Sequence, residues 1–314
     1  MQKSVGLYYE MKLFLNSHYA NNVTRRAYKK QAERFCDYIK KIFITANEAR
    51  TNPQAVLQLY ANDLVAQGLS ADTVHTYLSF PCAFFNLPMS AIDKPKRLAA
   101  EISRSRGEKN LQGAREATLA CNARIVAFQQ HVGVRRAELT KLNGMNLKQD
   151  ENGCWCVEVQ RGKGGKYQLQ RILPEDVEFV KQYFDGTAKP LFGRAELNNK
   201  IDFHSMRSAH ARIAYDYYLH LCESPVQRAQ LQQELRDRFA IYNKHYIYRC
   251  SEPSLLVQFE DDMEGEYRLR GSTAAFAKSK GRPVTYDKTA LMAVSVFHLS
   301  HWRCDVTVKN YMLA

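Results

Sequence analysis

Features that mark several common protein classes are missing from this chain of 314 residues. No apolar run approaches the roughly 18 residues that a membrane-spanning helix needs, and the first residues lack the apolar stretch of a secretory signal peptide. The eight cysteines include no C-x-x-C pair, so we expect reduced thiols, with neither a disulfide framework nor a metal site. No G-x-x-x-x-G-K-[ST] loop is present, which argues against nucleotide hydrolysis. We therefore expect a soluble intracellular protein that has no cofactor and no membrane partner.

Acidic residues are also in deficit, because 32 Asp and Glu oppose 45 Lys and Arg and leave a net charge of +13. A surplus of positive charge favours a polyanionic partner, since neutralising phosphates releases counterions. A basic protein without such a partner would have the same balance, so charge alone leaves that alternative open. Hydrophobic residues make up 45% of the chain, which is typical of a globular fold.

Helical patterns fill most of residues 1–93. Apolar residues recur at helical spacing over 24–43, which predicts a helix with one buried stripe. Asn52 and Pro53 predict the start of another helix, and Ser70 predicts a further one. The helix at 24–43 also carries cations that are available to solvent or phosphate: Arg25, Arg26, Lys29 and Lys30.

A charged stretch at 93–120, poor in large apolar residues, is typical of a linker. Beyond it, strand patterns at 154–160 and 167–174 flank a glycine-rich turn, which predicts an antiparallel hairpin. We therefore predict a mainly α protein with a small antiparallel β-sheet (α+β), with a helical domain at 1–105 and a mixed domain at 110–314. Helices of the mixed domain are expected at 114–131, 136–142, 174–184, 206–221, from 225 onward, and at 287–299.

Four short motifs in the second half carry residue types that can move a phosphodiester. Arginine side chains stay protonated and can hold the charge that gathers on the non-bridging oxygens of a phosphate under attack. A tyrosine hydroxyl becomes a useful nucleophile once a neighbouring base takes its proton. The motifs GVRRAELTKL, GKGGK, HSMR and HLSHWRCDVTVKNYMLA contribute the candidate catalytic residues Arg135, Lys163, His204, Arg207, His301 and Tyr311.

In this order, the motifs resemble those of the tyrosine recombinases, or phage-type integrases. That family shows G-[LV]-R-x-x-E-L, a G-K-G-x-K hairpin, H-x-x-R, L-G-H and a nucleophilic tyrosine. The matching segments here are 133–139, 162–166, 204–207, 299–301 and Tyr311. The resemblance extends to the first half, where GLSADTVHTYLSFPCAFF looks like part of the helical core DNA-binding domain of the family.

The resemblance implies a site-specific DNA recombinase or integrase of a mobile element. Such enzymes cleave and rejoin strands through a 3′-phosphotyrosyl intermediate and a Holliday junction, without a metal. The two arginines would hold the phosphate, and His204 would take the proton of Tyr311. Lys163 would protonate the departing 5′-oxygen, and His301 would bind a phosphate oxygen.

The resemblance also implies partners and a location. We expect a homotetramer on double-stranded DNA at specific recombination sites, a monomer free in solution, and a cytoplasmic, nucleoid-associated protein. Lys166 competes with Lys163 for the role in the hairpin and is otherwise expected to contact DNA, together with the cations at 25–30. Two further residues compete for catalytic roles, Arg136 with Arg135 and His298 with His301.

The sequence departs from the family pattern at Ser300 and in the spacing between two of the motifs. The usual Gly of L-G-H is Ser300, whose side chain would crowd the backbone if the position needs a positive φ. The long spacing between Arg207 and His301 indicates an insertion at about 222–284, which would make extra DNA or subunit contacts or be a tolerated surface addition. The alternatives to recombination are a catalytically silent DNA-binding regulator and a type IB topoisomerase-like enzyme that relaxes supercoils.

Overall fold

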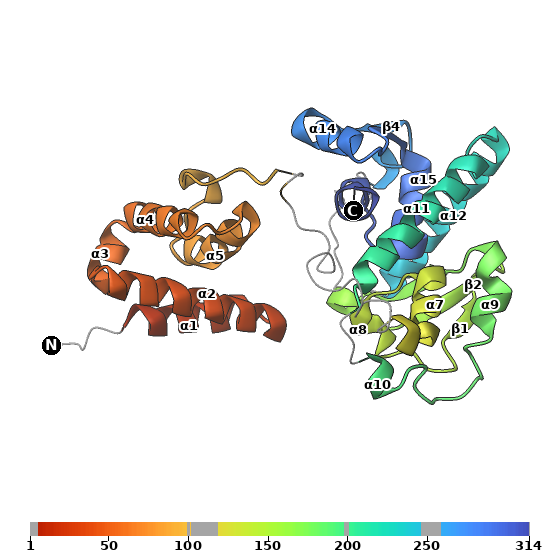
Figure 1. The fold of residues 1–314 in the computed structure, drawn as a ribbon, viewed down its shortest axis with the longest axis horizontal. Helices are drawn as coiled ribbons and strands as arrows, with labels where there is room; N and C mark the ends of the chain where they lie inside the picture. The colour runs from red at the N-terminus through yellow and green to blue at the C-terminus, as the bar shows by residue number, and fades with distance from the viewer. Residues whose placement is uncertain (1–5, 99–100, 102–118, 198–200, 246–258, 314) are drawn as a thin grey trace. The chain divides into compact units, whose positions relative to one another are not determined.

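The computed structural model describes residues 6–98, 101, 119–197, 201–245 and 259–313. The chain divides into two compact units, Met1–Ile102 and Ser103–Ala314, each drawn in Figure 1. The fold is mainly α with small antiparallel sheets, which confirms the predicted fold class. Within the described part of the chain, no helix is long and apolar enough to cross a membrane.

The first unit is built from amphipathic helices whose apolar faces share one core. Helix α4 begins at Pro53 with the Asn52 side chain as its cap, and α5 follows the capping side chain of Ser70, as predicted. The short α3 was not predicted, because six residues give little periodicity; a capping box between Thr45 and Glu48 holds it. In chain order the helices are α1 (Leu7–His18), α2 (Asn22–Lys41), α3 (Ala46–Thr51), α4 (Pro53–Ala66) and α5 (Ala71–Phe84).

The second unit contains a three-stranded antiparallel sheet in the order β1-β2-β3. Strands β2 (Trp155–Val159) and β3 (Gln168–Arg171) form the predicted hairpin, with Cys156 opposite Arg171 and Val159 opposite Gln168. Strand β1 (Leu147–Gln149) was missed, because three residues are too few to show an alternating pattern.

Helices cover this sheet and extend beyond it (Figure 1). The remaining elements are α7 (Ala123–Val132), α8 (Arg136–Leu139), α9 (Val177–Lys181), α10 (Arg194–Leu197), α11 (Phe203–Leu221), α12 (Pro225–His245), β4 (Glu266–Arg268), α14 (Gly271–Ser279), β5 (Thr285–Asp287), α15 (Lys288–Ala293), a π-helical segment Val294–Leu299, α16 (Cys304–Thr307) and a second π-helical segment Val308–Met312.

Several predicted helices are shorter or less regular than expected. The helix predicted at 136–142 is only the single turn of α8, and the one predicted at 174–184 is a 3₁₀ turn followed by α9. The last helix leaves α geometry at Val294 and continues as a π segment. The predicted linker at 93–120 and the predicted helix start at 114 lie largely outside the described residues.

The segment interpreted as an insertion is part of the core of the second unit. Helix α12 buries Leu231 and Leu235 in the same cluster as residues of α11 and α15. Strands β4 and β5 pair with each other and lead into α15. Burial of this kind is not typical of a tolerated surface addition.

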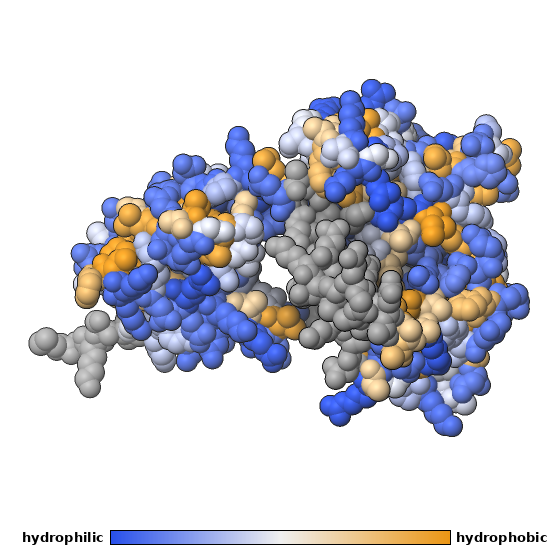
Figure 2. Space-filling model, viewed as in Figure 1, coloured by the Kyte–Doolittle hydropathy of each residue, from blue (hydrophilic) through white to orange (hydrophobic). Residues whose placement is uncertain are grey.

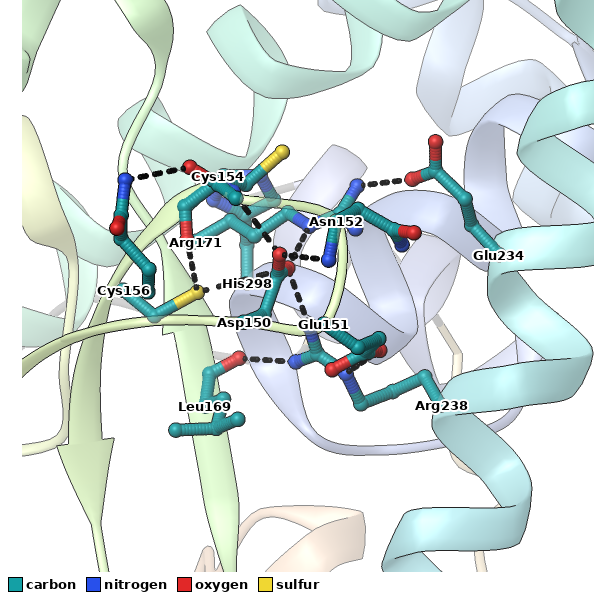
Figure 3. Close-up of polar contacts among 12 residues, drawn as sticks. Asp150, Glu151, Asn152, Cys154, Cys156, Leu169, Arg171, Glu234, Arg238 and His298 are labelled. Carbon is teal, nitrogen blue, oxygen red and sulfur yellow. Dashed lines mark hydrogen bonds and ion pairs between the residues drawn. The ribbon is translucent and has the colours of Figure 1, made fainter.

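A buried ion network joins α12 to the sheet (Figure 3). Asp150, in the turn between β1 and β2, accepts hydrogen bonds from Arg171 Nε at 2.8 Å and from Arg238 Nη2 at 2.6 Å. Glu234 and Glu151 bind the outer sides of the same two arginines, at 2.6 and 3.2 Å. The side chain of Asp150 is fully buried, and those of both arginines nearly so.

Three carboxylates surround the two guanidiniums of this network. Burial raises the pKa of the Asp150 carboxyl, but the charges and hydrogen bonds of Arg171 and Arg238 outweigh that effect and lower the pKa overall. The guanidinium carbon atoms of both arginines also lie over the Phe297 ring, at 3.8 and 5.2 Å from its centre. Removing one partner would leave uncompensated charge in a dry environment, which is far more costly than the pair itself is worth.

Outside the cores, hydrophilic residues cover most of the face that Figure 2 shows, and hydrophobic residues form only small groups. Large hydrophobic side chains that are exposed include Phe43 and Val23 in the first unit and Val226 and Met145 in the second. Scattered exposure of this kind is normal for most positions. The most exposed of them is Phe43, with 93% of its surface accessible.

We expect the substitution Asp150→Asn to lower the free energy of unfolding by about 3 kcal/mol, because it leaves two buried guanidiniums without their shared carboxylate. Chemical denaturation at neutral pH measures the change. Asp37→Asn is the matched control, because its side chain is 77% exposed and its ion pair with Lys40 is long at 3.9 Å. A loss below 1 kcal/mol for Asp150→Asn would show that the network contributes little. Since the folded pKa of Asp150 is lowered, its contribution is present above the unfolded pKa and is lost as pH falls through the folded pKa.

Candidate active site

Five of the six predicted catalytic residues lie together in the second unit, and two of them share one backbone oxygen. The carbonyl of Leu299 accepts hydrogen bonds from Arg135 Nη2 at 2.7 Å and from Arg207 Nη2 at 2.9 Å. Two guanidiniums therefore converge on a single acceptor.

Arg135 is fixed by the turn between α7 and α8. Gly133 ends α7 in the left-handed conformation, with φ of 67°, and a Cβ there would lie 2.8 Å from the His210 ring. Arg135 then adopts an extended conformation as the N-cap of α8, and its Nη1 binds Glu138 Oε1 at 2.7 Å. Glu138 also accepts the Arg135 backbone N–H at 2.9 Å, so the carboxylate holds both ends of this residue.

Glu138 is 1% exposed. Burial raises the pKa of its carboxyl, but the charges of Arg135 and Arg207 outweigh burial and lower the pKa overall. The carboxylate is therefore ionised at neutral pH and orients Arg135. The hairpin glycine Gly162 also approaches this carboxylate, because a Cβ there would lie 3.0 Å from Glu138 Oε1.

Arg207 projects from the first turns of α11 into the interior and is 1% exposed. Its Nη1 donates to the carbonyl of Gly133, at the end of α7, and also reaches Gln170 Oε1 at 3.4 Å. The Nε atom of Arg207 is buried without a hydrogen-bond partner. An unpaired donor of this kind at a cluster of cations is the feature expected of a site that binds an anion.

Tyr311 lies in the second π-helical segment and is 4% exposed. Its hydroxyl is 2.9 Å from His301 Nε2, and the same nitrogen is 3.3 Å from Arg135 Nη2. Because a guanidinium can only donate, His301 Nε2 must carry its lone pair, which leaves the ring proton on Nδ1. The tyrosine hydroxyl therefore donates to His301.

Burial, followed by the charges of Arg135, Arg207, Lys166 and Lys163, lowers the pKa of His301 to about 2. The ring is neutral at physiological pH and can accept a proton only if those positive charges are compensated. The two hairpin lysines are thus close enough to act on His301 through their charge. Lys163 is exposed on the 3₁₀ turn Lys163–Gly165, and Lys166 follows it directly.

His204 also contacts the Tyr311 ring. The centres of the two rings are 5.2 Å apart at an angle of 57°. The residue is exposed overall, and partial desolvation of its ring, together with the charges of Arg207 and Arg135, lowers its pKa. The Asp202 side chain accepts the His204 backbone N–H at 3.1 Å and so fixes the start of α11.

Arg136 and His298, which compete with Arg135 and His301, make their contacts elsewhere. Arg136 donates to the carbonyls of Leu197 and Ile201 and lies over the Phe203 ring at 4.3 Å. His298 is fully buried, and its ring binds His210 at 2.9 Å and the Tyr218 hydroxyl at 3.1 Å. Burial lowers the pKa of His298 well below its ordinary range, so it packs as a neutral core residue. The geometry therefore favours Arg135 and His301 over these two.

A hollow of about 290 Å³ in the first unit gathers most of the predicted phosphate-binding cations. Arg25, Arg26 and Lys29 from α2 line it, and Lys30 is exposed on the same helix. Lys12 from α1 also lines the hollow, and it was missed because nothing in the sequence pairs it with α2. The hollow thus combines cations from two helices.

Two groups of the active site were also missed by the sequence analysis. Glu138 was read only as part of a motif, and its burial against Arg135 gives it a positioning role. The Leu299 carbonyl carries no side-chain signal at all. Among the described residues, no group of three or more His, Cys, Asp or Glu side chains could hold a metal ion.

No protein-family model matches the chain, and no curated protein matches it. A solved structure, the crystal structure of XerA recombinase, is similar over 67% of this chain and 84% of that chain, with 16% identity and a TM-score of 0.23. A TM-score this low carries no functional weight, so the function has to be inferred from the geometry of the site.

Ser300 occupies the position at which the L-G-H motif has glycine. It follows Leu299 with φ of 53° and ψ of 41°, which is the left-handed region that favours glycine, and its hydroxyl is buried without a partner.

We expect Ser300→Gly to raise the free energy of unfolding by about 1 kcal/mol, because it removes both the left-handed strain of a residue with a Cβ and the buried, unpaired hydroxyl. Ser300→Ala, which keeps Cβ, should recover only the part due to the hydroxyl. Thermal or chemical unfolding measures both, and a destabilised Ser300→Gly would show that the hydroxyl has a useful partner.

Proposed function

We propose that this protein is a tyrosine-type site-specific DNA recombinase that cleaves and rejoins strands through a 3′-phosphotyrosyl intermediate. The observation that carries the proposal is the 2.9 Å contact between the Tyr311 hydroxyl and His301 Nε2, beside two converging guanidiniums. This arrangement combines a nucleophile, a proton acceptor and a site for developing negative charge.

The chemistry balances without a metal or a nucleotide. The Tyr311 oxygen attacks the phosphorus as its proton passes to His301, and the bond from phosphorus to the 5′-oxygen breaks. Arg135 and Arg207 hold the non-bridging oxygens, and Lys163 gives a proton to the departing oxygen. The phosphotyrosyl ester keeps the energy of the bond, so attack by a 5′-hydroxyl of another strand rejoins the DNA.

We assign the roles of the two histidines differently from the resemblance, which gives proton removal to His204. The Tyr311 hydroxyl lies 2.9 Å from His301 Nε2, and this contact supports His301 as the proton acceptor. We therefore assign the base to His301 and leave His204, exposed beside the Tyr311 ring, to face the phosphate.

A base with a pKa of about 2 is too weak for this task in the free protein. A bound phosphate would offset the charges of Arg135, Arg207, Lys163 and Lys166, which are the causes, after burial, of the low pKa. DNA binding would then raise the pKa of His301 toward the range of a useful base. The nucleophile is thus activated by its own substrate.

The wider proposal follows the resemblance. The hollow lined by Lys12, Arg25, Arg26 and Lys29 would bind backbone phosphates, which position a protein on DNA without reading its sequence. Four protomers would act on two recombination sites of a mobile element and pass through a Holliday junction. The protein would be cytoplasmic and associated with the nucleoid.

We expect the protein to form a covalent adduct with a nicked suicide duplex taken from the DNA that flanks its gene. Tyr311→Phe should bind the duplex but form no adduct, because it lacks the nucleophilic oxygen. Tyr217→Phe is the matched control, since this tyrosine lines a separate hollow together with Cys154, Arg171 and Glu234. Denaturing gels measure the adduct and mobility shifts measure binding. Binding by the native protein without an adduct would favour the silent regulator, and relaxation of plasmids without joining of two sites would favour the topoisomerase.

The assignment of the base predicts different losses for the two histidines. His301→Ala should slow adduct formation at least about 100-fold, the usual contribution of a general base, and His204→Ala should slow it less. A 5′-bridging phosphorothiolate substrate, whose sulfur leaves without a proton, should rescue Lys163→Ala but not His301→Ala. Exposed His220, with 82% of its side chain accessible, provides the control His220→Ala. A larger loss for His204→Ala would return the base role to that residue.

A further inference from the structure

The turn that ends helix α2 has a backbone conformation that is unfavourable for Phe43, the residue at that position. Phe43 follows the helix with φ of 59°, and 93% of its surface is exposed. Its backbone N–H donates to the Lys40 carbonyl at 3.1 Å, and that of Ile44 donates to the Ile39 carbonyl at 2.9 Å. These two bonds are the helix-ending Schellman motif, in which glycine or asparagine normally occupies the position of Phe43.

Phe43 is therefore a large aromatic residue at a position where the left-handed backbone conformation and the exposure of the ring to water are both unfavourable. A left-handed conformation costs a non-glycine residue free energy, and exposure of the ring forgoes the gain of burial. Asn86 occupies a comparable left-handed position after α5, so the fold uses a suitable residue elsewhere. A cost of this kind that the fold does not need points to a function of the side chain.

The face of α2 that leads to Phe43 is basic. Helical spacing and exposure place five cations on it together with the carboxylates of Glu33 and Asp37, which pair with Lys29 at 3.7 Å and with Lys40 at 3.9 Å. The face extends about 25 Å from Arg26 to Phe43 at 1.5 Å per residue, which corresponds to about seven base pairs of duplex DNA. The cations, in chain order, are Arg26, Lys29, Lys30, Lys40 and Lys41.

We propose that DNA lies along this face of α2 and that the ring of Phe43 inserts against a base step at its end. The inference rests on the proposed function only in that the partner is DNA. Isolated apolar side chains inserted between bases unstack a step and bend the duplex, while cations hold the flanking phosphates. A protein partner is less suited, because Lys40 and Lys41 flank the ring and the neighbouring Thr45 and Asn47 are exposed polar residues.

The substitution Phe43→Asn gives effects of opposite sign on folding and binding. Because asparagine accepts the left-handed conformation, the melting temperature of the protein should rise by about 2 °C. DNA affinity should fall about 10-fold, since the contact of one aromatic ring with a base is worth about that factor. Phe43→Tyr, which keeps the ring, should retain affinity. Leu59→Asn is the control for loss of an exposed apolar residue, because Leu59 is 48% exposed on α4.

Two measurements on the full chain test whether the Phe43 ring inserts against a base step of bound DNA. Fluorescence anisotropy gives the affinity for a short duplex bound by the native protein, and 2-aminopurine at successive positions of that duplex reports unstacking. We expect one position to brighten with the native protein and Phe43→Tyr, and to stay dark with Phe43→Asn. Unchanged affinity and unstacking in Phe43→Asn would overturn the inference, as would an effect on self-association alone. Failure of the native protein to bind any duplex would instead overturn the proposed function.

Discussion

The convergence of two guanidiniums on the Leu299 carbonyl is the contact on which the arrangement of the site depends. Like charges repel, and a shared acceptor with the buried Glu138 carboxylate is what lets Arg135 and Arg207 lie so close. The carbonyl is available because the helical segment ends at Leu299 and the chain reverses at Ser300. The last carbonyls of a helix have no partner within that helix, so the Leu299 oxygen can accept hydrogen bonds from both arginines.

The π-helical segment Val294–Leu299 connects the buried ion network around Asp150 to the site. Phe297 lies two residues before Leu299, and the guanidiniums of Arg171 and Arg238 pack on its ring. Those arginines are tied to Asp150 in the β1–β2 turn, and Arg238 comes from α12. The segment that presents the carbonyl is therefore held between the sheet and the helix. Helix α12, which the sequence pattern assigned to an insertion, therefore helps to hold this segment through Arg238.

Local signals explain what could be predicted from the sequence. Proline at the first turn of α4, serine before α5 and the glycine-rich hairpin each act within a few residues, so their outcomes followed from the chain alone. The motifs also indicated which side chains gather in the site. The short elements α3 and β1 gave too little pattern, and a backbone acceptor such as Leu299 gives none. The choice between His204 and His301 depends on contacts across the fold, which spacing along the chain does not contain.

The bonds that assemble the site join residues far apart in the chain. Arg207 and Gly133 are 74 positions apart, Arg207 and Leu299 are 92 apart, and Arg135 and His301 are 166 apart. Closing such long loops costs entropy before any contact repays it, and chains dominated by such contacts fold slowly. The first unit has its own core and needs none of these contacts. A partly folded molecule can therefore carry a finished basic surface while Tyr311, His301 and the two arginines are still apart, so under the proposed function an immature chain would bind DNA before it could cut it.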